Sequence, residues 1–289
     1  MTQPPPASAP SPRRGYRWRS GVVYGTAGKG GRALTLGLHA GDPAQQRPGV
    51  VFIHGGGWNS GTPGLLARLA DELAADGYVT ATIHYRLSGE ARWPAALEDA
   101  KCAVRWMRGH AAELGLDPRR IAVAGGSAGG QLAAMVALTP GRFEGSGGWA
   151  EVSSQVQAAV LYNPVVDLRS EALGRPPLPE RVQAFLGDDS DQVTAAQASP
   201  ITHVTPTCPP ILTRVGDQDE ATPPAVAEAF HAALDAAGVP NRLEIVVGKG
   251  HALPVHDHAG CLSATTRFLG EHFTSVIGSP ASTSPGPTR

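Results

Sequence analysis

The stretch "GGSAG" at residues 125–129 matches the pattern Gly-x-Ser-x-Gly, in which the serine commonly acts as a nucleophile. It overlaps the end of a short β-branched run, "IAVAG", and it precedes a run with helical character. Glycines at such a strand-to-helix turn allow the sharp backbone bend that exposes the serine hydroxyl. We therefore predict that Ser127 attacks the carbonyl carbon of a substrate.

Three histidines in "GKGHALPVHDHAG", residues 248–260, allow two interpretations. Together with Asp257 they could form a metal site, which would need three or four firmly held ligands. Alternatively, one histidine deprotonates the serine, while the other two are exposed and Asp257 caps the next helix. We favour the second interpretation, because His251 closely follows the strand run "LEIVV" and so reaches the edge of the sheet that carries the serine. His251 is the predicted base, His256 and His258 are predicted loop residues, and no metal is expected.

A carboxylate is needed to orient the base, and the loop "GDQDEATPP" after the strand run "PILTRV" offers three. We predict Asp219, because it lies three residues into the loop and can reach His251. Asp217 is closer to the tight turn at Gly216, which it is predicted to cap. Glu220 is the remaining candidate.

Backbone donors for the oxyanion are predicted in "HGGGW", residues 54–58, which follows an early strand run. Glycines expose their N–H groups because no Cβ stands in the way. We assign the oxyanion hole to the N–H groups of Gly56, Gly57 and Ala128.

The substrate pocket is predicted to include Trp58 and its neighbour Asn59. Trp58 could stack on an aromatic acyl group, or it could pack beneath residues 163–209. That segment links two strand runs and is much longer than the usual ~2–6 residues. It is either a wall or lid over the site or an excursion on the surface.

A parallel sheet would bring these loops together. Short runs that are apolar on both faces alternate with helical patterns, which is typical of a doubly wound α/β domain. The strand runs are 50–54, 79–84, 121–125, 158–162, 210–215 and 243–247, and a leading antiparallel pair is predicted at 21–25 and 33–38. The helical patterns are 64–77, 94–115, 128–138, 223–237 and 259–273.

Composition limits the class of protein. Of the 289 residues, 42% are hydrophobic, and 24 Lys and Arg nearly balance 25 Asp and Glu, which gives no sign of a nucleic-acid partner. No apolar run reaches the ~18–20 residues of a membrane span. Three widely spaced cysteines, Cys102, Cys208 and Cys261, predict neither a disulfide framework nor a metal clip. Oligomeric state is not indicated.

The ends of the chain are rich in Pro, Ser and Thr, so residues 1–14 and 279–289 are predicted to be disordered tails around a catalytic domain of residues 15–278. The first tail lacks the apolar segment of a secretory signal. We therefore expect a cytoplasmic protein, or a secreted one if a signal has been removed.

With these motifs the chain resembles the α/β-hydrolase superfamily, and within it the esterase branch with an HGGGW oxyanion motif, similar to bacterial feruloyl and acetyl-carbohydrate esterase-like (BD-FAE-like) proteins. The matching pieces include "HGGGW", "IAVAGGSAGGQLAA", "VGDQDEATPP" and "GKGHAL". The resemblance implies a central, mostly parallel sheet flanked by helices. It also implies a serine carboxylic ester hydrolase that forms an acyl-enzyme without a cofactor, on short-chain acyl, acetyl-carbohydrate or feruloyl-type esters.

Two alternatives remain open. Arylformamidases share an HGG-x-W motif and the same triad, so an amide could be the substrate. A non-catalytic binding module on this scaffold would usually lack a triad or oxyanion element, and none is missing. The chain also departs from related branches, with Gly126 where an acid is usual and Gln131 where His is frequent.

Overall fold

The computed structural model describes most of the 289-residue chain. Both predicted tails lie outside the described residues, which are 17–28, 30–169, 172, 179–187 and 192–274. No helix in these described ranges is long and apolar enough to cross a membrane.

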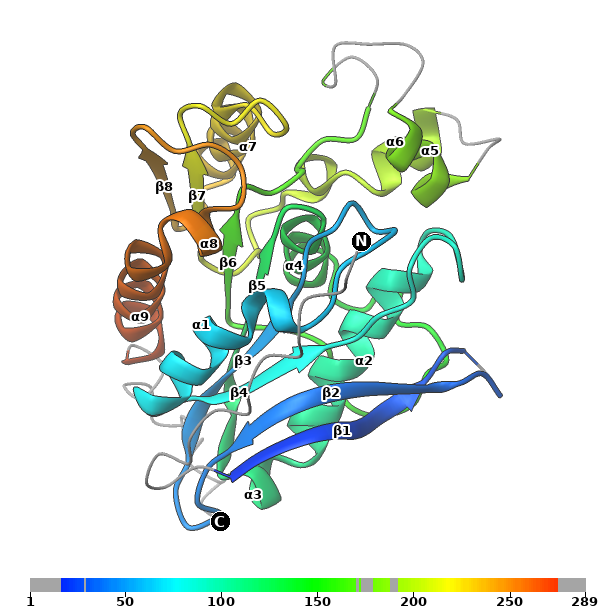
Figure 1. The fold of residues 1–289 in the computed structure, drawn as a ribbon, viewed down its shortest axis with the longest axis vertical. Helices are drawn as coiled ribbons and strands as arrows, with labels where there is room; N and C mark the ends of the chain where they lie inside the picture. The colour runs from blue at the N-terminus through cyan, green and yellow to red at the C-terminus, as the bar shows by residue number, and fades with distance from the viewer. Residues whose placement is uncertain (1–16, 29, 170–171, 173–178, 188–191, 275–289) are drawn as a thin grey trace, which may run out of the picture.

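An eight-stranded sheet forms the centre of the molecule, in the order β1-β2-β4-β3-β5-β6-β7-β8. β1 pairs with β2 and β2 pairs with β4 in antiparallel register, and the other neighbours are parallel. The strands are β1 Arg17–Thr26, β2 Ala33–Ala40, β3 Arg47–Ile53, β4 Val79–Ile83, β5 Leu116–Gly126, β6 Ala158–Tyr162, β7 Ile211–Gly216 and β8 Asn241–Val246. The predicted leading antiparallel pair and mostly parallel sheet are therefore confirmed (Figure 1).

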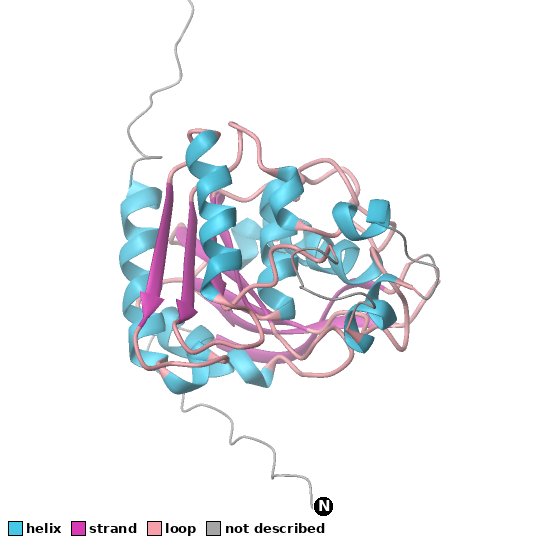
Figure 2. Cartoon of the chain, turned by 90° about the horizontal axis from the view of Figure 1, so that it is seen from above, coloured by secondary structure: helices cyan, strands magenta, loops and turns pink. Residues whose placement is uncertain are grey.

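Helices cover both faces of the sheet (Figure 2). The helices outside the long β6–β7 connection are α1 Gly64–Ala75, α2 Ala95–Gly109, α3 Ala111–Leu114, α4 Ala128–Leu138, α7 Pro224–Ala236, α8 Leu253–His256 and α9 His258–Thr274. Buried residues of α2, α4 and α7 belong to one hydrophobic cluster, and those of α1 and α9 belong to the other.

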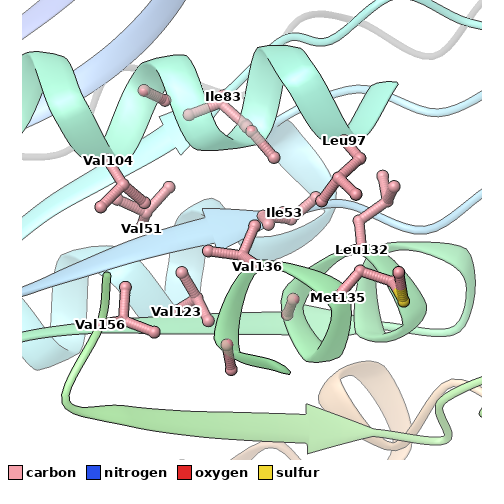
Figure 3. Packing of buried hydrophobic residues seen from close by; sticks show 14 of the residues in the cluster. Val51, Ile53, Ile83, Leu97, Val104, Val123, Leu132, Met135, Val136 and Val156 are labelled. Atoms are coloured by element: carbon pink, nitrogen blue, oxygen red, sulfur yellow. The ribbon is translucent and has the colours of Figure 1, made fainter. Parts of the chain in front are cut away.

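β3 shows why the central strands are apolar on both faces. Val51 and Ile53 point into the cluster with α2 and α4, while Val50 and Phe52 point into the cluster with α1 and α9. Successive side chains of a strand alternate between faces, so a strand covered by helices on both sides needs apolar residues throughout. Figure 3 shows the first cluster closely packed between the strands and the two helices.

The helical pattern at 94–115 forms two helices instead of one. α2 ends at Gly109, and α3 ends before Gly115, whose backbone is left-handed with φ 64°. At the break, Nδ1 of His110 lies 2.9 Å from the carbonyl oxygen of Trp106, which also accepts the backbone N–H of His110. This local side-chain contact with the last turn accompanies the change of backbone direction.

β8 is less buried than its apolar sequence predicted. It lies at the edge of the sheet, and Ile245 is 42% exposed. Every residue of β8 is half-buried or exposed, so the expectation that this strand is covered on both faces is wrong.

The described residues of the long connection between β6 and β7 include the short helices α5 Glu180–Leu186 and α6 Gln192–Gln197 and the 3-10 helix η1 Pro200–His203. In Figure 1 the arrowheads of β6 and β8 point to the top of the picture, where α5 and α6 also lie. In parallel sheets of this kind, the loops that carry the active site follow the carboxyl ends of the strands. The connection therefore lies at the same edge of the sheet as the predicted site residues.

Candidate active site

Ser127 lies at the sharp turn between β5 and α4, with φ 55°. Its backbone N–H donates to the carbonyl oxygen of Tyr162 at the end of β6, 2.8 Å away. The neighbouring glycines are required by close packing: a methyl group on Gly125 would lie 2.1 Å from the oxygen of Gly129, and one on Gly129 would lie 2.1 Å from the oxygen of Ile53. The chain before and after Ser127 therefore approaches other backbone too closely for any residue but glycine, and this tight turn holds Ser127 in its strained conformation.

The three predicted side chains are brought together by three separate loops. Nε2 of His251 lies 2.9 Å from Oγ of Ser127, and Nδ1 of His251 lies 2.8 Å from Oδ2 of Asp219. The loops follow β5, β7 and β8, whose carboxyl ends meet at one edge of the sheet. The arrangement can move a proton from the serine to the imidazole and stabilise the resulting cation.

Asp219 is 3% exposed, yet it is held in its ionised form. Burial alone would raise its pKa, but hydrogen bonds from His251 and Thr222 outweigh that effect and lower the pKa of Asp219 to about 2. Oδ1 accepts the backbone N–H groups of Ala221 and Thr222, at 2.9 and 2.8 Å. The carboxylate is therefore fixed in orientation before it meets the histidine.

The other two candidate acids are exposed and do not reach the histidine. Oδ1 of Asp217 accepts the backbone N–H of Gly248, 2.7 Å away, so this residue links its loop to the start of the histidine loop. Asp217 thus joins two loops, whereas we predicted a cap of its own turn. Glu220 is exposed.

Asn163 and Thr222 complete the surroundings of Asp219, and neither was predicted from the sequence. The side-chain amide of Asn163 donates to Oδ2 of Asp219, while its Oδ1 accepts the backbone N–H of Leu253, 3.1 Å away. The hydroxyl of Thr222 donates to Oδ2 of Asp219 at 2.7 Å. A polar residue directly after the apolar strand run "AAVLY" was the available signal for Asn163, whose φ of 47° is tolerated best by Asn and Gly.

The other two histidines have different environments. His256 is exposed, as predicted. The side chain of His258 is 12% exposed and its Nε2 lies 2.9 Å from Oε2 of Glu72, so the prediction of a solvated loop residue is wrong. His258 begins α9, which packs beside α1, and this contact between helices buries it.

Asp257 precedes α9, and its carboxylate accepts from Nη1 of Arg214 at 3.0 Å. In the described part of the chain, no three His, Cys, Asp or Glu side chains lie close enough to hold a metal ion.

The predicted oxyanion loop is held by its own backbone. The carbonyl oxygen of Gly56 accepts from the N–H of Ser60 at 3.1 Å and from its hydroxyl at 2.8 Å. Gly56 and Gly57 have φ of 117° and 60°, in the region that favours glycine. Within the described residues, no protein acceptor takes the N–H groups of Gly56, Gly57 or Ala128.

The side chain of His54 packs and hydrogen-bonds against this loop. Its Nδ1 donates to the carbonyl oxygen of Gly55 at 2.7 Å, and its ring stacks on Tyr85 with centroids 4.4 Å apart. Burial lowers the pKa of His54 to about 4, so the ring is neutral at neutral pH. The sequence showed this histidine as part of the motif but indicated no role for it.

A pocket of about 720 Å³ opens above Ser127. Its wall combines the oxyanion loop and the histidine loop with α1, α5 and α8, and Asn59 is part of it, as predicted. Its lining residues are Gly55, Gly56, Gly57, Asn59, Ser60, Leu65, Leu66, Gly126, Ser127, Tyr162, Asn163, Pro179, Glu180, Arg181, Ala184, His251, Ala252, Pro254 and Val255. Of the two open interpretations of residues 163–209, α5 supports a wall of the site.

Trp58 does not line this pocket, which contradicts its prediction as a pocket residue, whereas the alternative that it packs against residues 163–209 is confirmed. It is 2% exposed and stacks on Phe185 of α5, with ring centroids 4.5 Å apart and an interplanar angle of 9°. Its Nε1 donates to Oε1 of Gln131 at 3.0 Å, and Nε2 of Gln131 donates to the oxygen of Ala198 at 2.7 Å. The large ring thus anchors the β6–β7 connection, and Gln131 joins it to α4.

A family model, BD-FAE, matches residues 38–234. The chain belongs to the BD-FAE family. The resemblance predicted from the motifs is confirmed, and so is the α/β-hydrolase fold of this BD-FAE protein.

Relatives of this BD-FAE protein are named as esterases. It is 32% identical over 222 residues to the probable carboxylic ester hydrolase LipM of Mycobacterium tuberculosis, covering 75% of this chain and 52% of LipM. It is 32% identical over 280 residues to esterase LipQ of the same organism, covering 93% of this chain and 64% of LipQ. The chain thus spans about half to two thirds of the length of these curated relatives.

A solved structure agrees over nearly the whole chain. The propionate-bound esterase Est2 of Thermogutta terrifontis superimposes with a TM-score of 0.77 at 31% identity, covering 94% of this BD-FAE chain and 97% of Est2.

Proposed function

We propose that this protein hydrolyses carboxylic esters through an acyl-enzyme on Ser127. The observation that carries the proposal is the continuous set of contacts from Asp219 through His251 to Ser127, at 2.8 and 2.9 Å, which ends in an open pocket. The esterase names of its relatives and of its structural neighbour support the same activity.

In the acylation step, Nε2 of His251 takes the proton of Ser127 as Oγ attacks the ester carbonyl. The N–H groups of Gly56, Gly57 and Ala128 stabilise the oxyanion of the tetrahedral intermediate. The imidazolium then protonates the leaving alkoxide, and an ester remains between the acyl group and Ser127.

In the deacylation step, His251 removes a proton from water, which attacks the acyl carbonyl. The same oxyanion donors act again, and the proton returns to Oγ of Ser127 as the acid departs. Asp219 stabilises the imidazolium in both steps. Because its pKa is about 2, it remains ionised throughout the neutral range.

The substrates we propose are short-chain acyl esters, including acetylated carbohydrates. Bound propionate in Est2 supports a short acyl group. Feruloyl-type esters have less support than the motif suggested, because the stacked pair of Trp58 and Phe185 is buried away from the pocket lining.

A substrate panel tests the proposal: p-nitrophenyl esters of rising chain length, methyl ferulate, acetylated xylan and an aryl formamide. We expect turnover of the short esters, with kcat reduced at least ~10⁴-fold in Ser127→Ala. An unchanged unfolding curve would show that the variant is folded. Turnover of the formamide without turnover of any ester would favour the arylformamidase alternative. A Ser127→Ala variant that kept a tenth or more of the native activity would refute the assignment of Ser127 as the nucleophile.

A further inference from the structure

The pocket has two unlike sides. Leu65 of α1 and Val255 of α8 line it and are 51% and 63% exposed, so one side of the pocket offers apolar surface. Polar side chains, among them Asn59 and the two charged residues Glu180 and Arg181 of α5, also belong to the lining. In Figure 1, α5 lies at the upper right, apart from α1 and α8, which lie nearer the middle on the left.

Arg181 is directed towards the oxyanion loop. A methyl group on Gly57 would lie 3.2 Å from Cδ of Arg181 and 3.9 Å from its Cβ, so the aliphatic part of this side chain packs over the glycine. Arg181 is exposed and lines the pocket, so its guanidinium, which continues from Cδ, is within reach of a ligand there. Oδ1 of Asn59 would lie 3.6 Å from the same methyl group, which places a hydrogen-bonding group on this side too.

Arg181 has no carboxylate partner within the described ranges. Other arginines near the core of the protein do have one, such as Arg86 with Asp99 at 2.8 Å and Arg214 with Glu244 at 2.8 Å. Glu180 does not neutralise it, because consecutive residues of a helix point in different directions. A planar guanidinium with free donors in a pocket is suited to bind a carboxylate.

We propose that Arg181 selects esters that carry an anionic group, such as a carboxylate, several atoms from the ester carbonyl. The proposal rests on the proposed esterase activity and names its substrate class. The apolar part of such a substrate lies against Leu65 and Val255, while its anion is bound by Arg181 and Asn59.

The experiment compares kcat/KM for matched anionic and neutral esters. One arm uses mono-4-nitrophenyl adipate and its methyl-capped diester, which place the anion on the acyl side. The other arm uses 4-butyryloxybenzoate and its methyl ester, which place the anion on the alcohol side. Each arm yields the ratio of anionic to neutral kcat/KM.

We expect Arg181→Met, which keeps the length of the stem, to lower this ratio by about three- to tenfold in at least one arm. Arg181→Lys should retain most of the preference, and Glu180→Gln should raise it by about twofold. The preference of the native protein should weaken as salt is added. Arg242→Gln removes a half-buried arginine of β8 that pairs with Glu271 of α9, outside the pocket lining, and it should leave both ratios unchanged.

A shift in one arm alone supports the proposal and shows which half of the ester carries the anion. Ratios that are unchanged in Arg181→Met, while neutral esters are still hydrolysed, overturn the proposal and leave the esterase activity standing. If the native protein hydrolyses neither the anionic nor the neutral esters, the esterase proposal fails and this inference fails with it.

Discussion

The side-chain amide of Asn163 donates a hydrogen bond to Oδ2 of Asp219. The same oxygen lies 2.8 Å from Nδ1 of His251, and the other end of the amide accepts the N–H of Leu253, two residues beyond that histidine. Asn163 therefore joins the acid to the histidine loop, and we expect it to position both.

Replacing Asn163 by Gly keeps the left-handed backbone but removes both bonds, so kcat should fall by about 10- to 100-fold. Asn163→Asp places a second carboxylate beside Oδ2, and this added negative charge favours the protonated imidazole of His251, so the acid limb of the kcat/KM profile should move to higher pH. Steady-state kinetics across pH measures both effects. If Asn163 only stabilises the fold, both variants would unfold at lower temperature while kcat and the pH profile stayed native. Asn241→Asp, outside the pocket lining, is the control and should leave kcat and the pH profile native.

The choice of Asp219 over Asp217 is tested by two isosteric variants. Asp219→Asn should lower kcat by up to ~10⁴-fold, because an amide favours the wrong imidazole tautomer. Asp217→Asn weakens one exposed bond to Gly248 and should cost about 1 kcal/mol of stability at most, with kcat close to native. Kinetics and thermal unfolding of both proteins decide between them, and an inactive Asp217→Asn with an active Asp219→Asn would reverse the assignment.

The three histidines of the 248–260 loop should respond differently to alanine. His251→Ala should be as inactive as Ser127→Ala. His258→Ala loses the contact with Glu72 and about 1 kcal/mol of stability, and His256→Ala loses little; both should keep kcat within a few-fold of native. EDTA should not change the rate. Loss of activity on chelation, with recovery on adding zinc, would restore the metal interpretation.

The lowered pKa of His54 predicts that the stability of the folded protein depends on pH. Its pKa is about 4 in the folded protein, against 6.5 for an unperturbed histidine, so protons bind more tightly to the unfolded chain. The contribution of neutral His54 is complete above pH 6.5 and is lost as the pH falls towards 4, for a total of about 3 kcal/mol. His54→Gln should flatten this part of the profile in denaturant unfolding. A variant whose stability falls as steeply as the native protein between pH 6.5 and 4 would show that His54 is not the responsible group.

Much of the architecture follows from local sequence patterns. Apolar runs such as "VVFIH" and "AAVLY" predicted strands covered on both faces, because side chains alternate along a strand. The serine turn was evident for a similar reason: the glycines that permit it are local, and they stand in the sequence beside Ser127. Parallel strands place their carboxyl ends at one edge, so the order of the loops also indicated which ones would meet.

Contacts between distant segments had no such local signal. The stacking of Trp58 on Phe185, the pairing of His258 with Glu72 and the bridge from Asn163 to Asp219 each join elements that lie far apart in the chain. His258 and Asn163 would suit an exposed loop equally well, and for Trp58 the sequence left burial and substrate contact both open, so residue types and spacing did not distinguish the two environments. The break at His110 and the exposure of β8 likewise depend on which neighbours are present.

The sequence by itself determined the order of strands and helices, the strained serine turn and the three loops that converge on it, because each of these depends on residues adjacent in the chain. Only the tertiary structure decided which side chains hold Asp219, which aromatic ring is buried, and which charge faces the pocket. Those outcomes depend on burial and on hydrogen-bond partners, which arise when distant segments pack together.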